Sequence, residues 1–182
     1  MRNLLDEHIR QVTDSLENLT PSKRAAFAAA IAETLYPNYL AFSKNKRWGD
    51  PSVLRSALDL VWKSVDGSPI TAESAVDFRE KIEKVTPDME EFGSDTQGSL
   101  ALDAATAVHS ALACALNGDP DEATTAARSA IDSKYMNLEN ATEELNTLLQ
   151  RPEVQKEFEY QRELLNALQN MSRISKERLL SL

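Results

Sequence analysis

The stretch LYPNYLAFSKNKRWGDPSVLRSALDLVW, residues 35–62, contains the signals that decide the fold of this chain. Asp50 is a good N-cap residue, and Pro51 suits the first turn of a helix, where its missing N–H is not needed. After this pair the apolar residues recur every three or four positions, as along one face of a helix: Leu54, Leu58, Val61 and Val65. The pattern predicts a helix that starts at Pro51 and buries one face.

The same two signals recur along the rest of the chain. A capping residue precedes proline at Thr20-Pro21, Thr86-Pro87 and Asp119-Pro120, while Thr71 and Pro152 open two further segments. No stretch alternates apolar and polar residues well enough for a strand. We therefore expect one compact all-α domain over residues 1–182, with about seven to eight helices. Their approximate extents are residues 5–19, 21–35, 51–65, 71–85, 99–116, 120–134, 135–149 and 152 to the C-terminus, with Val76 and Ile82 facing inward.

The composition is typical of a soluble helical protein. Glycine is scarce, with 5 residues in 182, which favours helix. The single cysteine, Cys114, excludes an intrachain disulfide and fits a reducing compartment. Charged residues interrupt the N-terminal segment every three or four positions, so we expect no signal peptide and no membrane span. These features predict a cytoplasmic protein that does not enter a membrane.

The net charge of −9 is unevenly distributed. Residues 67–150 carry 16 acidic and only 5 basic side chains. A surface this acidic repels phosphate backbones, so we expect no nucleic-acid binding. Solubility is the simplest reason for the acidic segment. A second interpretation is a decoy that occupies a basic partner protein, which requires these acids to gather on one face.

The motifs of helical metal and phosphate enzymes are absent. The sequence has no Glu-x-x-His pair for a di-iron bundle, no His-Glu-x-x-His zinc motif and no glycine-rich phosphate loop. We therefore expect no metal, no cofactor and, on balance, no catalysis. We expect His8 at the surface and His109 half-buried in a structural role, with a ligand role as the alternative. Cys114 is expected to be a small buried group and not a nucleophile.

Two acids interrupt apolar runs and are candidate site residues. Asp59 has Arg55 four positions before it and Lys63 four positions after it, so we expect an ion pair on the helix surface. Asp103 has no basic residue three or four positions away. It predicts an interhelix hydrogen bond or a pocket acid.

The connection around Pro37 is the least ordinary part of the chain. Pro37 is expected to break or kink the helix, because its ring blocks the bond to the carbonyl of Glu33. Aromatic and basic side chains follow, next to the free N–H groups of the helix capped by Asp50: Tyr36, Tyr39, Phe42, Trp48, Lys44, Lys46 and Arg47. Such a set can hold an anionic ligand. The alternative, and the commoner use of such residues, is that the aromatics seal the core beside a solvated basic turn.

On these residues the sequence resembles the YjaG-like proteins, a bacterial family of unknown function. The likeness rests on LYPNY (35–39), Phe42, Gly49-Asp50 and LDLVW (58–62), and continues through Asp103, VHSAL (108–112) and RPEVQKEFEYQRELL (151–165). It spans most of the chain but is weak in the N-terminal helix and over residues 67–98. The resemblance implies an all-helical bacterial protein, and it supplies no activity, substrate or cofactor. The residues that match the family pattern are Tyr36, Pro37, Asn38, Tyr39, Asp50, Asp59, Trp62, Asp103 and His109.

Two functions from different classes fit the sequence. The first is a non-catalytic binding or regulatory protein of the bacterial cytoplasm, acting on an unidentified protein partner. It is expected to be a homodimer through the wide apolar arc of its last helix: Leu164, Leu165, Leu168, Met171 and Ile174. The second is an enzyme or small-anion binder with a pocket near Tyr36, Tyr39, Trp62, Asp103 and His109. The candidate ligand-binding residues are Tyr36, Asn38, Tyr39, Arg47, Asp50, Asp59, Trp62, Asp103 and His109.

Overall fold

The computed structural model describes residues 4–93, 95–136 and 145–182, and every regular element within these ranges is a helix. The long helices are α1 (Leu4–Glu17), α2 (Pro21–Lys46), α3 (Pro51–Val65), α4 (Ala72–Val85), α6 (Thr96–Asn117), α7 (Pro120–Met136) and α9 (Pro152–Asn170). Three single-turn helices accompany them: α5 (Met89–Phe92), α8 (Leu145–Leu148) and α10 (Lys176–Leu179). The predicted all-α fold is confirmed.

Most of the predicted helix starts are confirmed, and three of them have a side-chain cap. The side chains of Thr20, Asp50 and Thr71 accept hydrogen bonds from backbone N–H groups in the first turns of α2, α3 and α4. Each side chain satisfies a donor that a helix start leaves unpaired. The start at Thr86-Pro87 is wrong, because Thr86 closes α4 and Asp88 caps the next helix instead.

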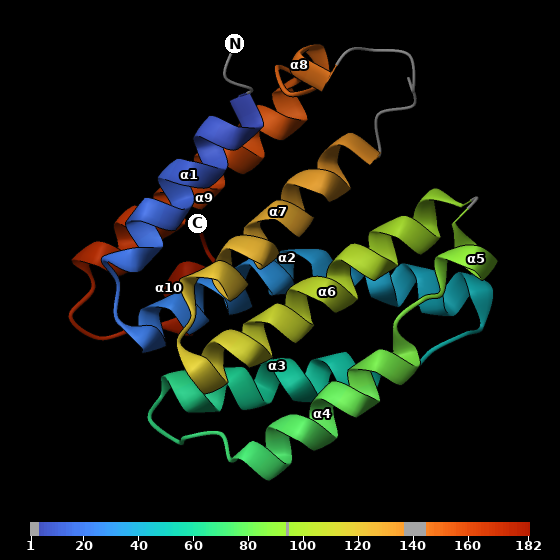
Figure 1. The fold of residues 1–182 in the computed structure, drawn as a ribbon, viewed down its shortest axis with the longest axis horizontal. Helices are drawn as coiled ribbons and strands as arrows, with labels where there is room; N and C mark the ends of the chain where they lie inside the picture. The colour runs from blue at the N-terminus through green and yellow to red at the C-terminus, as the bar shows by residue number, and fades with distance from the viewer. Residues whose placement is uncertain (1–3, 94, 137–144) are drawn as a thin grey trace.

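Helices α2 and α6 form the centre of the fold, and α7 lies beside them (Figure 1). Alanines make the close approach possible, since residues 25–32 of α2 are buried with six alanines among them. Helix α6 is likewise buried along its alanines and Val108. By length and composition α6 is the one helix in the described ranges that could cross a membrane. Here it packs against α2, α3, α4 and α7 as the central helix of the core.

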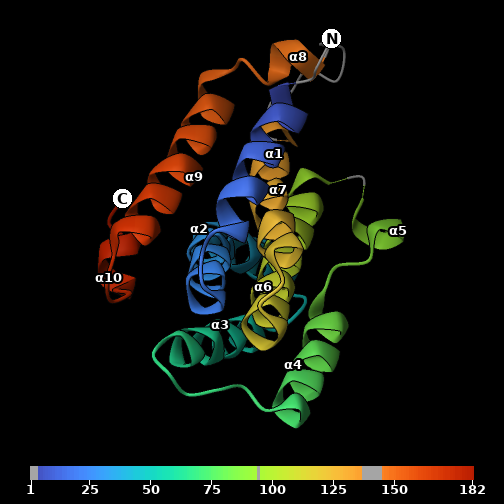
Figure 2. The same ribbon diagram turned by 60° about the vertical axis from the view of Figure 1, so that its left-hand side comes forward.

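The remaining helices surround this centre. Figure 2 shows α9 at one edge of the bundle and α4 with α5 at the opposite edge. Helices α1 and α9 pack on α7, where a small second cluster of buried side chains includes Leu5, Ile9, Ile131 and Phe158. His8 lies in this layer with 4% of its surface exposed, so its predicted surface position is wrong.

Three further expectations need correction. Helix α2 continues through Pro37 to Lys46, so the predicted break is wrong, whereas a kink at Pro37 stays a prediction; the buried Tyr39 and Phe42 lie in the part of the helix beyond the proline. Val76 was expected to face inward, but it is 53% exposed. The helix predicted over residues 135–149 lies mostly outside the described ranges: its first two residues belong to α7, which ends at Met136, residues 137–144 are not described, and α8 covers Leu145–Leu148.

The apolar arc of α9 is used within the chain itself. Leu164, Leu165, Leu168 and Met171 are all buried, and Ile174 packs against the same core. The arc that was expected to face a second subunit is therefore covered by α2 and its neighbours. The homodimer remains a prediction, but this apolar arc of α9 is not free to form its interface.

Candidate functional site

Three of the predicted site residues gather around Glu33 on α2. Arg55 donates to both carboxylate oxygens of Glu33 at 2.8 Å, and Trp62 Nε1 donates to the same group at 2.9 Å. Asp59 pairs with Arg55 at 3.0 Å, which is the predicted helix-surface ion pair. The Tyr36 ring lies under the Arg55 guanidinium, 5.4 Å from its centroid. Every charged group of this cluster has a partner, so the cluster joins α2 to α3 and does not leave a group free for a ligand.

The predicted anion site at the start of α3 is filled by the chain. Asp50 accepts hydrogen bonds from the backbone N–H of Ser52 at 2.9 Å and from its hydroxyl at 2.7 Å, so a carboxylate already occupies this helix end. Lys46 pairs with Asp95. Arg47, at a φ of 53°, closes α2 in the left-handed conformation, and its side chain is exposed.

Tyr39 and Asn38 belong to the end of α2. Tyr39 is fully buried, its hydroxyl donates to the carbonyl of Val85, and burial raises its pKa to about 12. Asn38 is half-buried on the same helix. Tyr39 therefore fixes the end of α4 against α2, as expected for an aromatic that seals a core.

Asp103 and His109 face different neighbours along α6. Asp103 accepts a hydrogen bond of 2.8 Å from the Ser133 hydroxyl on α7, and burial raises its pKa to about 6. His109 is half-buried, as predicted, in a cleft of about 320 Å³ between α4 and α6 that also contains Glu83 and Thr106. Of Tyr36, Tyr39, Trp62, Asp103 and His109, only His109 lines any of the clefts that we describe, so the five side chains do not form the predicted common pocket.

A larger cleft lies where three distant segments meet. The start of α2, the end of α3 and the link between α9 and α10 enclose about 550 Å³. The short α10 contacts α2 and so brings the C-terminal end of the chain beside the N-terminal end of that helix (Figure 1). The lining residues are Thr20, Ser22, Lys23, Val65, Asp66, Gly67, Met171, Ser172, Arg173 and Ile174. We call this space the α2–α3–α10 cleft.

The cations of this cleft have no acidic partner among the described residues. Lys23 donates to the backbone carbonyl of Gln169 at 3.4 Å, and no ion pair involves it or Arg173. Other cations of the described chain also lack an ion pair, Arg47 and Arg162 among them, so the distinctive feature of Lys23 and Arg173 is that they line the same cleft. Two unpaired cations in one concave space attract an anion.

The end of α2 that opens into the cleft adds to this positive field. A helix N-terminus carries partial positive charge that an acidic cap or an acid in the first turn offsets. Among the long described helices, α2 alone has neither: its cap is the neutral Thr20, and its first turn carries Lys23 and Arg24. The cleft thus combines side-chain cations, hydroxyls and a helix end that favours negative charge, with Asp66 as its one carboxylate.

The arrangement suits binding better than catalysis. The lining contains no histidine or cysteine, the residues that most often transfer protons or act as nucleophiles near neutral pH. Within the described ranges no three His, Cys, Asp or Glu residues gather in a way that could hold a metal ion. Sequence reasoning missed Lys23 and Arg173, because they are 150 positions apart and neither belongs to a motif. The absence of an acid from the first turn that follows Thr20 was the one signal that could have pointed to them.

The chain is similar to known bacterial proteins over most of its length. A family model described as "Protein of unknown function (DUF416)" matches residues 11–182. The "Uncharacterized protein YjaG" of Salmonella typhimurium is 29% identical over 163 residues, which cover 84% of this chain and 79% of that protein. The protein of the same description from Escherichia coli K12 is 28% identical over 160 residues, with the same coverage.

A solved structure supports the fold. The crystal structure of a DUF416 family protein from Shewanella baltica matches with a TM-score of 0.79, covering 93% of this chain and 89% of that one. The two sequences are 22% identical, so the likeness concerns the arrangement of helices alone. The family model and the bacterial relatives confirm the resemblance seen in the sequence.

Proposed function

Because this chain belongs to the DUF416 family, which is described as of unknown function, we propose a function from its geometry: it is a non-catalytic binding protein for a small anionic molecule. The α2–α3–α10 cleft is the binding site. The observation that carries the proposal is that Lys23 and Arg173 line one cleft of about 550 Å³ without an acidic partner in the described part of the chain, although the net charge is −9.

The lining also suggests the kind of anion. Lys23 and Arg173 suit a phosphate or carboxylate group, and the hydroxyls of Thr20, Ser22 and Ser172 can donate to the same oxygens. Asp66 repels a second negative charge but accepts hydrogen bonds from hydroxyl or amine groups. A molecule with one anionic end and a hydroxylated body, such as a small phosphorylated polyol, meets both requirements.

Titration calorimetry with glycerol 3-phosphate tests this proposal. We expect saturable binding that weakens between low salt and about 0.5 M salt, because the attraction is partly screened. Lys23→Gln and Arg173→Gln should each weaken binding about tenfold, the loss of one charge-assisted contact. Neutral glycerol should not bind measurably.

Lys44→Gln is the matched control. It removes the same charge from the same helix, but lies 21 residues further along, about 30 Å away at 1.5 Å per residue. Its affinity should equal that of the unmodified protein. Equal losses for Lys23→Gln and Lys44→Gln would show that net charge and not the cleft is responsible, and would reject the proposal.

The remaining expectations about the cell stay predictions. These are the cytoplasmic location, the homodimer, a protein partner, and the absence of nucleic-acid and membrane binding. The acidic decoy also stays a prediction, and it finds less support than the cleft. Asp77 and Asp95, two of the acids it requires, are already paired with lysines of the same chain.

A further inference from the structure

A buried polar contact joins α1 to α9. The Nε2 atom of His8 lies 2.9 Å from Oε1 of Gln161, which is fully buried. The side-chain nitrogen of Gln161 donates to the backbone carbonyl of Ala127 at 3.0 Å and to Glu157 at 2.9 Å. One glutamine amide thus connects three helices through groups that water does not reach.

The bonds of Gln161 fix the tautomer of His8. A backbone carbonyl only accepts, so the atom that faces Ala127 is the amide nitrogen and the atom that faces His8 is the amide oxygen. That oxygen also only accepts, so Nε2 of His8 carries the hydrogen. Burial lowers the pKa of His8, and the nearby charge of Arg162 lowers it further against the opposing effect of the Gln161 bond. The ring is therefore neutral at pH 7 and has a bare lone pair on Nδ1.

This lone pair has no partner. Nδ1 of His8 is the one buried side-chain nitrogen or oxygen in the described residues without a hydrogen bond. The ring is held by Phe158, stacked at a centroid distance of 4.0 Å, so it cannot easily turn to find a donor. A buried acceptor left unpaired destabilises the folded protein. The described residues supply no hydrogen-bond donor to Nδ1 of His8.

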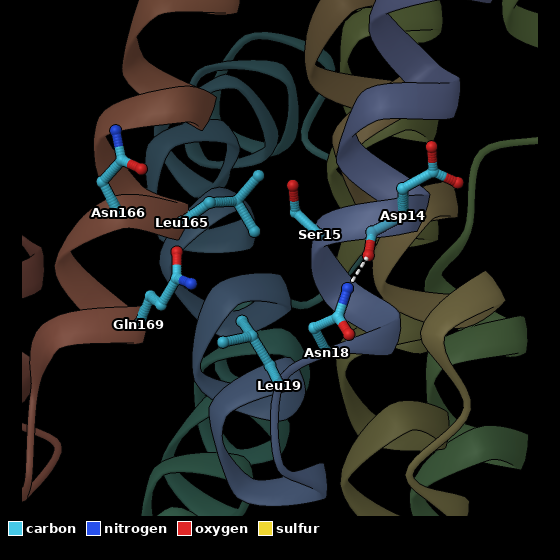
Figure 3. Close-up of a pocket in the computed structure, with 7 residues that line it drawn as sticks. All are labelled: Asp14, Ser15, Asn18, Leu19, Leu165, Asn166 and Gln169. Carbon is cyan, nitrogen blue, oxygen red and sulfur yellow. Dashed lines mark hydrogen bonds between the residues drawn. The ribbon is translucent and has the colours of Figure 1, made fainter.

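His8 also forms part of the wall of a groove between α1 and α9. About 210 Å³ of open space adjoins it, lined as well by Val12, Arg162 and Leu165. A second space of about 250 Å³ continues along the same two helices and shares Ser15, Leu165 and Asn166 with the first. Figure 3 shows Leu19 and Leu165 projecting into this second space between the helices. We call the two spaces together the α1–α9 groove.

The groove has an apolar floor and amide rims. Asn166 and Gln169 line it on α9, Gln11 lines it on α1, and Asn18 lines it just beyond the end of α1. The side-chain amides of Asn166 and Gln169 form no hydrogen bond with the described residues, and Arg162 has no ion pair there. A ligand amide matches these rims, because it offers one N–H donor and one carbonyl acceptor at fixed spacing.

We propose that the α1–α9 groove binds a small neutral molecule with an amide group, whose N–H donates to Nδ1 of His8. Its carbonyl oxygen accepts from Arg162, and its apolar body packs on Val12 and Leu165. Nδ1 is covered in the ligand-free protein, so binding includes a small opening of α1 against α9. The open groove beside the contact leaves room for that shift.

The test uses full-length protein labelled with ¹⁵N and two probes, benzamide and N,N-dimethylbenzamide. Long-range ¹H–¹⁵N spectra report both ring nitrogens of each histidine. Benzamide should shift the Nδ1 signal of His8 saturably while the signals of His109 stay in place. The dimethyl compound has no N–H and should bind about tenfold more weakly, the value of one lost hydrogen bond. Equal affinities, or an Nδ1 signal that benzamide leaves unchanged because water already occupies it, would overturn the proposal.

Two variants at exposed positions, Arg162→Gln and Ser15→Leu, test the groove without disturbing the buried core. Arg162→Gln removes the proposed partner of the carbonyl and should weaken benzamide severalfold. Ser15→Leu fills the groove and should abolish the shift of His8, while Ser56→Leu, at an exposed position on α3, should not. Full binding by Ser15→Leu would exclude the groove. None of these variants touches the α2–α3–α10 cleft, so binding of glycerol 3-phosphate should be unchanged in all three.

Discussion

The guanidinium of Arg55 on α3 lies against the carboxylate of Glu33 on α2, with two N–H···O bonds of 2.8 Å. Burial alone would raise the pKa of Glu33, but the bonds from Arg55 and Trp62 and the nearby charge of Lys176 outweigh it, and the pKa lies below its usual value. Lys176 itself lies over the Trp62 ring, 5.2 Å from the centroid. Glu33 therefore holds together α2, α3 and the C-terminal α10.

Glu33→Gln should destabilise the protein by about 2 kcal/mol, because it leaves the partly buried Arg55 without a charged partner. In a chain of this length that corresponds to a Tm lower by roughly 4–8 °C. Urea unfolding at pH 7 measures the change. Asp59→Asn is the control: its pair with Arg55 is 53% exposed on the Asp59 side and should contribute less than about 0.5 kcal/mol.

The stability loss caused by Glu33→Gln should depend on pH. Because the pKa of Glu33 is lowered in the folded protein, its contribution is present above its ordinary value of 4.5 and is lost as the pH falls through the folded value. The difference between the unmodified protein and Glu33→Gln should therefore shrink in acid. A difference that stays constant down to pH 3 would show that the effect is steric and not electrostatic.

Gly49→Ala should destabilise the protein by about 3 kcal/mol. Gly49 has a φ of 74°, which strains any other residue, and an added Cβ would overlap the hydroxyl of Tyr39. Gly67→Ala separates the two effects, since its φ is 105° but nothing lies within 4 Å, so only about 1 kcal/mol of strain is expected. In the Tyr39→Phe protein, Gly49→Ala should lower the free energy of unfolding by less than it does in the unmodified protein. Unfolding of the unmodified protein, the two single variants and the double variant measures this coupling. Additive losses would contradict the contact.

The helices could be predicted because their signals are local. Caps such as Thr20 and Asp50 and apolar residues spaced three or four apart decide where a helix starts and which face it buries. The break predicted at Pro37 was wrong, since the burial of Tyr39 and Phe42 in the following turn outweighs the local effect of the proline on the helix. The surface position predicted for His8 was wrong as well, because its partner Gln161 is brought to it only in the folded chain.

The sites could not be predicted, since they are made by residues far apart in the chain. Lys23 and Arg173 meet only after α10 folds back on α2. Glu33 was overlooked although it is an acid within an alanine-rich helix, the same signal that singled out Asp103. Spacing along one helix identifies neighbours on that helix, but it contains no information about which helix packs opposite.

Asp103→Asn should stabilise the protein at alkaline pH. Burial raises the pKa of Asp103 from 3.8 to about 6, despite the bond from Ser133, so the folded protein binds more protons than the unfolded chain between these values. Its stability therefore falls as the pH rises from about 4 to 6 and stays lower above. The variant removes this loss and should gain about 1 kcal/mol at pH 8, allowing for partial exposure to water, and nothing at pH 4. Equal effects at both pH values would contradict the raised pKa.

Pro37→Ala should stabilise the protein by about 1–3 kcal/mol. Proline inside a helix has no N–H to donate to the carbonyl four residues earlier, here that of Glu33, and its ring crowds that turn. The Pro37 side chain is exposed, so alanine loses little burial in return. Thermal unfolding measures the gain. Pro51→Ala is the matched control, because Pro51 occupies the first turn of α3, where no such bond is blocked, and its change should stay within about 0.5 kcal/mol. A loss of stability in Pro37→Ala would mean instead that the proline sets the angle at which Tyr39 and Glu33 reach their partners.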